Sequence, residues 1–179
     1  MGSRIALLRG VNLGVSRRVA MADLRRVLTD AGFHDVRSLL QSGNLVFRAT
    51  DNSDEAVEAA VEQALQASLG LTTEAVVRTP EAWLQMIGAN PFTEEARSDP
   101  GRLVAMVMKT TPAANAELSI NKIEGPERAR VIGQDVFIYY PDGQANSKCA
   151  GARLDKALGA RGTARNWNTV LKLAATVSQ

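Results

Sequence analysis

The sequence has only one cysteine and one histidine among its 179 residues. Cys149 alone cannot form a disulfide within the chain, which fits a reducing, cytoplasmic compartment. A cysteine–histidine nucleophile would have to use Cys149 and His34 with each other, and this pair is also too few ligands for a conventional zinc site. We therefore expect no metal and no cofactor. Aromatic residues make up only 4% of the chain, so the cores must be mainly aliphatic.

Long apolar runs are missing as well. No run approaches the roughly 20 residues that cross a membrane, and the first residues lack the apolar stretch and cleavage pattern of a secretion signal. The net charge of +2 is too small to indicate a nucleic-acid partner by itself. No paired carboxylates indicate acid–base chemistry. The composition therefore predicts a cytoplasmic globular protein without a membrane partner, and it leaves open both the oligomeric state and whether any reaction is catalysed.

The first 79 residues alternate short apolar runs with amphipathic stretches. The pattern predicts a helix that Gly32 closes and a second helix between Ser53 as N-cap and Gly70 as the stop. Gly43-Asn44 is predicted to form a two-residue hairpin turn. The expected strands cover 5–8, 36–41, 45–48 and 75–78. The resulting order, β-α-β-β-α-β, is that of a ferredoxin-like sandwich.

The pattern then restarts after a connection. Residues 80–101 contain a short helix through Ile87 and turn-forming residues. The second half predicts elements over 103–108, 112–120, 128–132 and 136–140, and a helical region from 152 that restarts at Thr163. No last strand is recognisable. We therefore expect an α+β fold of two ferredoxin-like (βαββαβ-type) units related by internal duplication, the second incomplete. The expected divisions are 1–79, 80–101 and 102–179.

Two polar loops are expected at one end of the first sheet. The crossover makes the first two strands point the same way, which places the loop after the first strand beside the hairpin turn. That loop feeds a helix N-terminus, where free N–H groups attract anions. The alternative is a long loop whose glycines only allow its turns. The candidate ligand-binding residues here are Arg9, Asn12, Arg18, Ser42 and Asn44.

A second polar stretch, 163–169, is predicted to open the last helix. Thr163 is a candidate N-cap, and Trp167 is expected in the core with Val170, Leu171 and Ala174. Arg165 is expected to point outward from the first turn, where it could hold an anion. The asparagines could equally tie neighbouring loops together through backbone bonds. The further candidate ligand-binding residues are Lys148, Arg165, Asn166, Asn168 and Thr169.

Several motifs together resemble those of a known bacterial family, domain of unknown function 1697. They run in the family's order along nearly the whole chain, and they are Leu8–Gly14, Met21–Arg25, Gln41–Phe47, Asn90–Phe92, Ser147-Lys148 and Arg165–Thr169. One departure is Cys149, where the family more often has an aliphatic residue. The resemblance implies a two-part α+β structure of ferredoxin-like units. It implies no established activity.

Three functions follow as hypotheses. The first is binding of a small anionic ligand, such as a nucleotide or a phosphorylated metabolite, with arginines pairing its charge and asparagines giving directional bonds. The second is a nucleic-acid-binding module. Ferredoxin-like sheets bind RNA through aromatic residues on their strands, and Phe47 is the one aromatic residue in the first three expected strands, which counts against this mode. The third is an interaction or scaffold protein whose polar motifs are structural.

Overall fold

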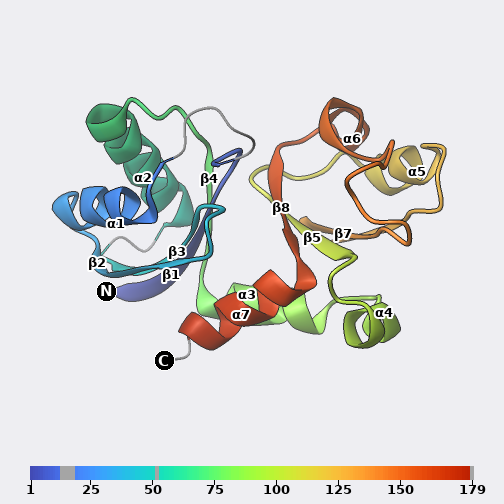
Figure 1. Ribbon diagram of the computed structural model, residues 1–179, viewed down its shortest axis with the longest axis horizontal. Coiled ribbons are helices and arrows are strands. Elements are labelled where there is room, and N and C mark those ends of the chain that lie inside the picture. Colours follow the sequence, from blue (N-terminus) through green and yellow to red (C-terminus); the bar gives the residue numbers. More distant parts are fainter. Residues whose placement is uncertain (13–18, 51–52, 178–179) are drawn as a thin grey trace. The chain divides into compact units, whose positions relative to one another are not determined.

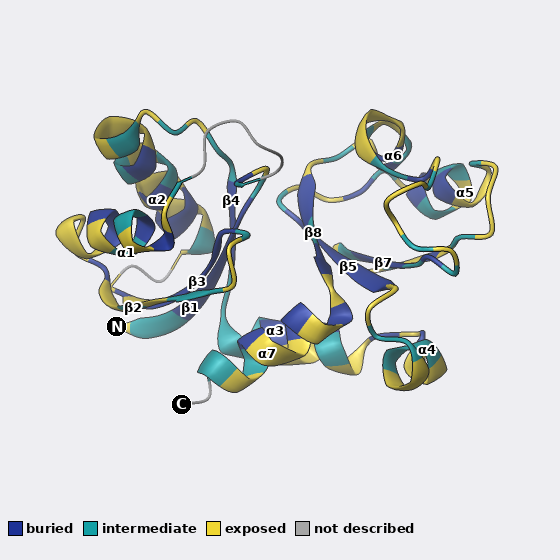
Figure 2. Ribbon diagram, in the orientation of Figure 1, coloured by how far each residue is buried: buried dark blue, intermediate teal, exposed yellow. Residues whose placement is uncertain are grey.

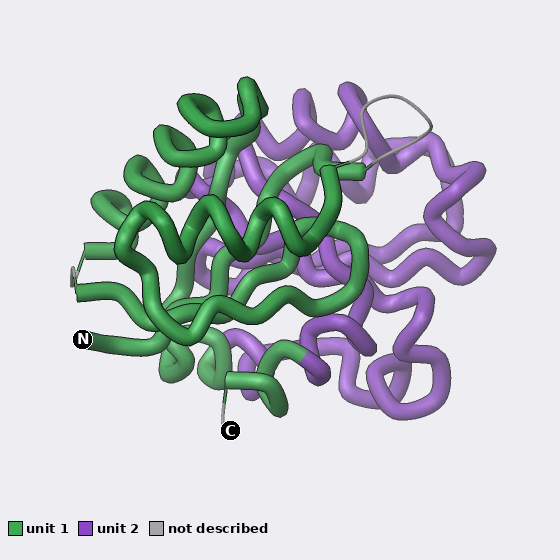
Figure 3. Tube along the Cα trace, turned by 60° about the vertical axis from the view of Figure 1, so that its left-hand side comes forward, with its two compact units in different colours: residues 1–85, 173–179 green, residues 86–172 purple. Residues whose placement is uncertain are grey.

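The computed structural model describes residues 1–12, 19–50 and 53–177 of the chain, and within them the fold is α+β with two four-stranded antiparallel sheets. The chain divides into two compact units, residues 1–85 with 173–179 and residues 86–172 (Figure 3). The expected connection, 80–101, is thus shared between the two units, and the end of the last helix belongs to unit 1.

Unit 1 begins with two strands that run in the same direction, as the crossover requires. Its elements are β1 (Gly2–Leu8), α1 (Met21–Asp30), β2 (His34–Leu39), β3 (Asn44–Ala49), α2 (Asp54–Leu69) and β4 (Ala75–Arg78). The strand order in the sheet is β2-β3-β1-β4. Both β2 and β1 pair antiparallel with β3, so the ends of β1 and β2 lie at the same edge of the sheet.

The helices of unit 1 begin and end at the residues that the sequence marks. The Ser53 hydroxyl accepts a hydrogen bond from the Ala56 N–H and caps α2. Gly70 ends this helix in the left-handed conformation, φ 59°, which glycine adopts at little cost. Both helices cover one face of the sheet (Figure 1), with a core that includes Leu24, Leu65 and Phe47.

Unit 2 repeats this order of elements. The chain passes through α3 (Pro80–Gly88) and α4 (Thr93–Ser98) into β5 (Leu103–Met108), α5 (Ala116–Asn121), β6 (Arg128–Ile132), β7 (Asp135–Tyr139), α6 (Gly151–Leu158), β8 (Gly162–Asn166) and α7 (Trp167–Val177). The sheet order is β6-β7-β5-β8. Helices α5 and α6 bury one sheet face, with Met106, Ile138 and Leu154 in the core. Figure 2 shows buried residues concentrated in the strands of both sheets.

The prediction that unit 2 is incomplete was wrong. Residues 162–166 form strand β8, which pairs antiparallel with β5 from Val104↔Asn166 to Met108↔Gly162. The pattern concealed this strand because its buried positions carry Thr163 and Arg165 instead of apolar side chains. A strand is recognised by alternation of apolar and polar residues, and here the alternation is between buried and exposed polar residues.

Smaller differences occur at loops. The predicted two-residue turn at Gly43-Asn44 is a four-residue turn over 40–43, and Asn44 is the first residue of β3. Leu40 and Gly43 both have positive φ, 60° and 68°. Helix α4 was not predicted, and α5 begins at Ala116 instead of near 112. These are six-residue helices, which are too short to show an apolar stripe.

Candidate functional site

The loop after β1 and the β2–β3 turn lie together at one edge of the first sheet, which confirms that part of the topological prediction. The Leu8 N–H donates to the Gly43 carbonyl over 2.8 Å, and the Asn12 side-chain amide donates to the Gln41 carbonyl, also over 2.8 Å. A Cβ on Gly43 would lie 2.8 Å from the Cβ of Leu8. Glycine is therefore required at this close approach as well as for the positive φ.

Asn12 fastens the loop to its surroundings. Its amide nitrogen also donates to the Val19 carbonyl over 3.0 Å, and its oxygen accepts from the Val19 N–H over 2.8 Å. Its backbone is left-handed, φ 58°, a conformation that asparagine tolerates better than most residues. Both polar ends of the side chain are thus engaged by backbone groups. The loop that follows, with Arg18 among its residues, lies outside the described residues.

Asn44 and Ser42 are engaged in a similar way within the turn. The fully buried Asn44 amide donates to the Leu39 carbonyl and to the Ser42 hydroxyl, each over 3.0 Å. Buried amides are costly unless they are bonded, so these contacts explain the asparagine without a ligand. Arg9 lies nearby, in a shallow hollow with Gly10 and Thr72, and pairs with Glu74 at 3.3 Å.

The second group of candidates lies on β8 and the start of α7. The prediction that Arg165 points outward from a helix N-terminus was wrong, because Arg165 is a buried strand residue. Its guanidinium donates to the Thr163 hydroxyl over 2.8 Å and to the Ala164 carbonyl over 2.7 Å. Burial lowers the pKa of Arg165 to about 10, so it remains charged at neutral pH.

Asn166, not Thr163, caps helix α7. Its side-chain oxygen accepts from the Thr169 N–H over 3.0 Å and from the Thr169 hydroxyl over 2.9 Å, which is the bonding of an N-cap residue. Asn168 is exposed on the first turn. Trp167 is buried, as predicted, against the Phe137 ring at 6.2 Å, whereas Leu171 is 43% exposed.

Lys148 lies apart from both groups, in the loop before α6. Its ammonium pairs with Glu124 at 2.6 Å, on the wall of a hollow of about 310 Å³ that also carries Glu127 and Asp142. An anion in this hollow would face carboxylates, so the surroundings do not favour it. Within residues 1–12, 19–50 and 53–177, no three His, Cys, Asp or Glu side chains gather as metal ligands.

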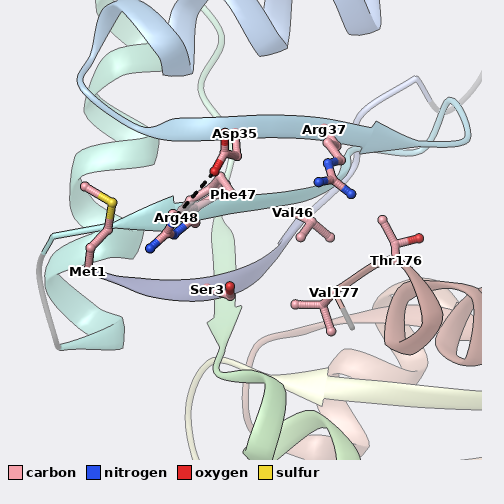
Figure 4. Close-up of a pocket in the computed structure, with 9 residues that line it drawn as sticks. All are labelled: Met1, Ser3, Asp35, Arg37, Val46, Phe47, Arg48, Thr176 and Val177. Carbon is pink, nitrogen blue, oxygen red and sulfur yellow. Dashed lines mark ion pairs between the residues drawn. The ribbon is translucent and has the colours of Figure 1, made fainter. Parts of the chain in front are cut away.

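A cationic hollow was missed by the sequence analysis. It lies within unit 1, measures about 330 Å³, and is lined by residues of β1, β2, β3 and the end of α7 (Figure 4). Its side chains include Arg37, Arg48, Asp35, Ser3, Val46 and Val177. Within the part of the chain that the structure describes, the Arg37 guanidinium forms no hydrogen bond or ion pair. It is exposed and faces the hollow.

The hollow lies beside an irregularity in β2. The β2–β3 register shifts between His34 and Arg37, and Asp35 adopts φ 53°. Bulges of this kind change the direction of a side chain and are frequent near functional sites, and a non-glycine residue at positive φ stores strain. Asp35 lies 3.8 Å from Arg48 across the pair of strands. Sequence alternation places Val46 and Arg48 on one strand face, but no motif marks this face as a site.

The comparisons with known proteins bear on family and fold. A family model described as "Protein of unknown function (DUF1697)" matches residues 1–137. The chain belongs to this family. The match confirms the resemblance that the motifs carried. No curated protein matches the chain.

Among solved structures, the chain resembles the conserved bacterial protein SP0830 from Streptococcus pneumoniae. The two are 21% identical with a TM-score of 0.75, over 100% of this chain and 99% of that protein. This DUF1697 chain therefore shares the fold of the streptococcal protein. A second structure, named "Putative Chlorite dismutase TA0507", is 15% identical over 97% of each chain, but its TM-score of 0.24 carries no argument. In the described residues, no helix is both long and apolar enough to cross a membrane.

Proposed function

We propose that the protein binds a small anionic ligand in the hollow between Arg37 and Arg48. The observation that carries the proposal is the Arg37 guanidinium, which faces the hollow without a protein partner in the described residues. Guanidinium groups form paired hydrogen bonds with phosphate and carboxylate oxygens. Arg37 is therefore available to an incoming anion without first breaking an ion pair.

Arg48 adds a second cation at small cost. Its distance of 3.8 Å from Asp35 is at the limit of an ion pair, and the two side chains are 49% and 62% exposed. Exposed pairs of this kind contribute about 0–1 kcal/mol, so a ligand can share Arg48 with Asp35. Val46 and Val177 line the same hollow and reduce the contact of a bound anion with water, which strengthens its attraction to the arginines.

The size of the hollow limits the ligand. Its volume of about 330 Å³ is near the lower end of the range for ligand pockets, roughly 300–1,000 Å³. A phosphorylated metabolite or a single nucleotide fits this range better than a dinucleotide. The hydrogen bonds of Asn12, Asn44 and Asn166 support a structural role for these motif residues, so we place the ligand at Arg37 and not at the asparagines predicted from the motifs.

A second candidate, an interaction or scaffold protein, is favoured by the same asparagine bonds, because polar motifs that are used up in the fold leave no built ligand site of their own. The nucleic-acid hypothesis gains no support from Phe47. That ring lies in the core against Phe33, with centroids 4.7 Å apart, and is not available to stack on a base.

We further propose that the two units are ferredoxin-like copies produced by duplication. The sheet orders, β2-β3-β1-β4 and β6-β7-β5-β8, are the same pattern. Arg78 opposite Ile5 corresponds to Arg165 opposite Ala105, and each guanidinium donates to the carbonyl of the preceding residue, over 2.8 Å and 2.7 Å. The buried reduced thiol of Cys149 supports our proposal of a cytoplasmic location.

Binding can be tested by NMR titration with inorganic phosphate at constant ionic strength. We expect saturable shifts of the backbone amides of Arg37, Val46 and Thr176 in the wild type and loss of saturation in Arg37→Gln. Arg26→Gln is the matched control, since Arg26 lies on α1 and pairs with Asp23 and Asp30. Equal saturation in wild type and Arg37→Gln would reject the site. Mass spectrometry of small molecules that copurify with the native protein would then identify the natural ligand.

A further inference from the structure

The two arginines of the hollow lie at different ends of it. Arg37 is opposite Val46 in the β2–β3 register, and Arg48 lies two residues further along β3. Such diagonal neighbours have Cα atoms about 7–8 Å apart. Figure 4 shows Val46 between the two guanidinium groups, with Val177 near it. A ligand that reaches both ends therefore crosses an apolar middle section.

The two ends also differ in chemistry. At the Arg37 end, no carboxylate lines the hollow. At the Arg48 end, the Asp35 carboxylate lies 3.8 Å from the guanidinium, and Ser3 is the β1 residue opposite Arg48. This end offers donors and an acceptor together, with no net charge from its side chains.

From this asymmetry, and resting on the proposed function, we infer that the ligand has one anionic head and a hydrogen-bonding tail that is not anionic. The head binds Arg37, and a short carbon chain lies along Val46 and Val177. The tail, a hydroxyl or an ammonium group, bonds at Asp35, Arg48 and Ser3. A second anionic group at this end would meet the Asp35 carboxylate, and like charges at close range disfavour binding.

Four probes with the same phosphate head test this inference: phosphoethanolamine, glycerol phosphate, ethyl phosphate and phosphoglycolate. Their tails carry an ammonium group, hydroxyls, a methyl group and a carboxylate. We expect phosphoethanolamine and glycerol phosphate to bind about fivefold or more tighter than phosphoglycolate, with ethyl phosphate between them, since tenfold corresponds to about 1.4 kcal/mol. The dissociation constants would come from NMR titration at matched ionic strength.

Asp35→Asn is the deciding variant, because asparagine tolerates the positive φ of this position and removes the charge. It should bring phosphoglycolate level with the other probes. Asp30→Asn, which removes an exposed carboxylate on α1, should leave the order unchanged. Tighter binding of phosphoglycolate by the wild type, equal binding of all four probes, or an unchanged order in Asp35→Asn would overturn the inference while phosphate binding itself stood. Failure of every probe, inorganic phosphate included, would overturn both proposals.

Discussion

The two units protect opposite edges of their sheets by the same means. In unit 1, the edge strand β4 has outward N–H groups at Val77 and Ala75, and these donate to Glu58 and Glu62 of α2 over 2.9 Å and 2.8 Å. In unit 2, the protected edge is β6. The N–H groups of Val131 and Ala129 donate to Glu117 and Asn121 of α5 over 2.8 Å and 2.9 Å.

The shared spacing explains why the same means works twice. Residues four apart on a helix lie on one face and rise about 6 Å, and residues two apart on a strand are separated by about 6.8 Å. Two side chains at this helical spacing can therefore reach two alternate N–H groups. In each unit the protecting helix is the one that leads into the protected strand. Edge strands whose donors are occupied in this way are poor templates for pairing with another chain.

A second likeness joins the last strands. Strand β4 leads through Thr79 into α3, and β8 leads through Asn166 into α7. Both of these residues cap the helix that follows, since the Thr79 hydroxyl accepts from the Ala82 N–H over 3.2 Å. Each helix carries a buried tryptophan, Trp83 or Trp167. This likeness predicts that equivalent substitutions in the two units have similar effects.

The largest effects are expected at the two tryptophans. Trp83→Ala and Trp167→Ala should each lower the free energy of unfolding by about 3–5 kcal/mol, because a buried Trp is replaced by a cavity. Urea denaturation followed by circular dichroism gives the measurement. Leu84→Ala and Leu171→Ala, at positions that are 54% and 43% exposed, should change stability by no more than about 0.5 kcal/mol. A small effect at one tryptophan alone would break the likeness between the helices.

Next come the residues that protect the sheet edges. Glu58→Ala leaves the buried N–H of Val77 without its acceptor, which should cost about 1–3 kcal/mol. Glu58→Gln keeps an acceptor oxygen and should recover much of this loss. In unit 2, Asn121→Ala removes two bonds with Ala129 and should cost a similar amount. If both alanine variants denatured like the wild type, the side chains would not be protecting the edges.

A smaller effect is expected at the two caps. Thr79→Ala and Asn166→Ala should each lower stability by about 0.5–2 kcal/mol, because each removes the acceptor for an orphan N–H of the helix. Asn166→Asp should be tolerated, since aspartate caps as well as asparagine does. The same urea titrations apply. A loss at Asn166→Ala that Asn166→Asp does not repair would assign this residue a role other than capping.

Periodicity predicted most elements because apolar side chains decide them. The bounds of β4, β5 and β6 are as expected, and the expected contact between the loop after β1 and the turn follows from the crossover alone. Strand β8 was missed because Thr163 and Arg165 occupy its buried positions. The hollow at Arg37 was missed for a different reason. It depends on a bulge at Asp35 and on the return of the end of α7 to unit 1, and neither is written in a local pattern.

The smallest effect concerns Cys149, which can report on unit 2 alone. The residue is 1% exposed, and burial, followed by the charge of Glu127, raises the pKa of its thiol to about 11. The native thiol thus keeps its proton between about pH 9 and 11, whereas the unfolded thiol loses it, so this residue's contribution to stability falls as pH rises through that window. Cys149→Ala should remove this part of the alkaline slope of the unfolding free energy, measured by urea titrations at pH 8 and 10.

Labelling of the thiol sharpens the comparison between the units. At pH 8 the buried, protonated thiol should react with a disulfide reagent only when unit 2 opens. Trp167→Ala, in unit 2, should therefore speed labelling more than Glu58→Ala, in unit 1, even after each rate is corrected for the variant's global stability. Equal corrected rates would show that the units open together, and rapid labelling of the wild type at the rate of a free thiol would contradict the burial of Cys149.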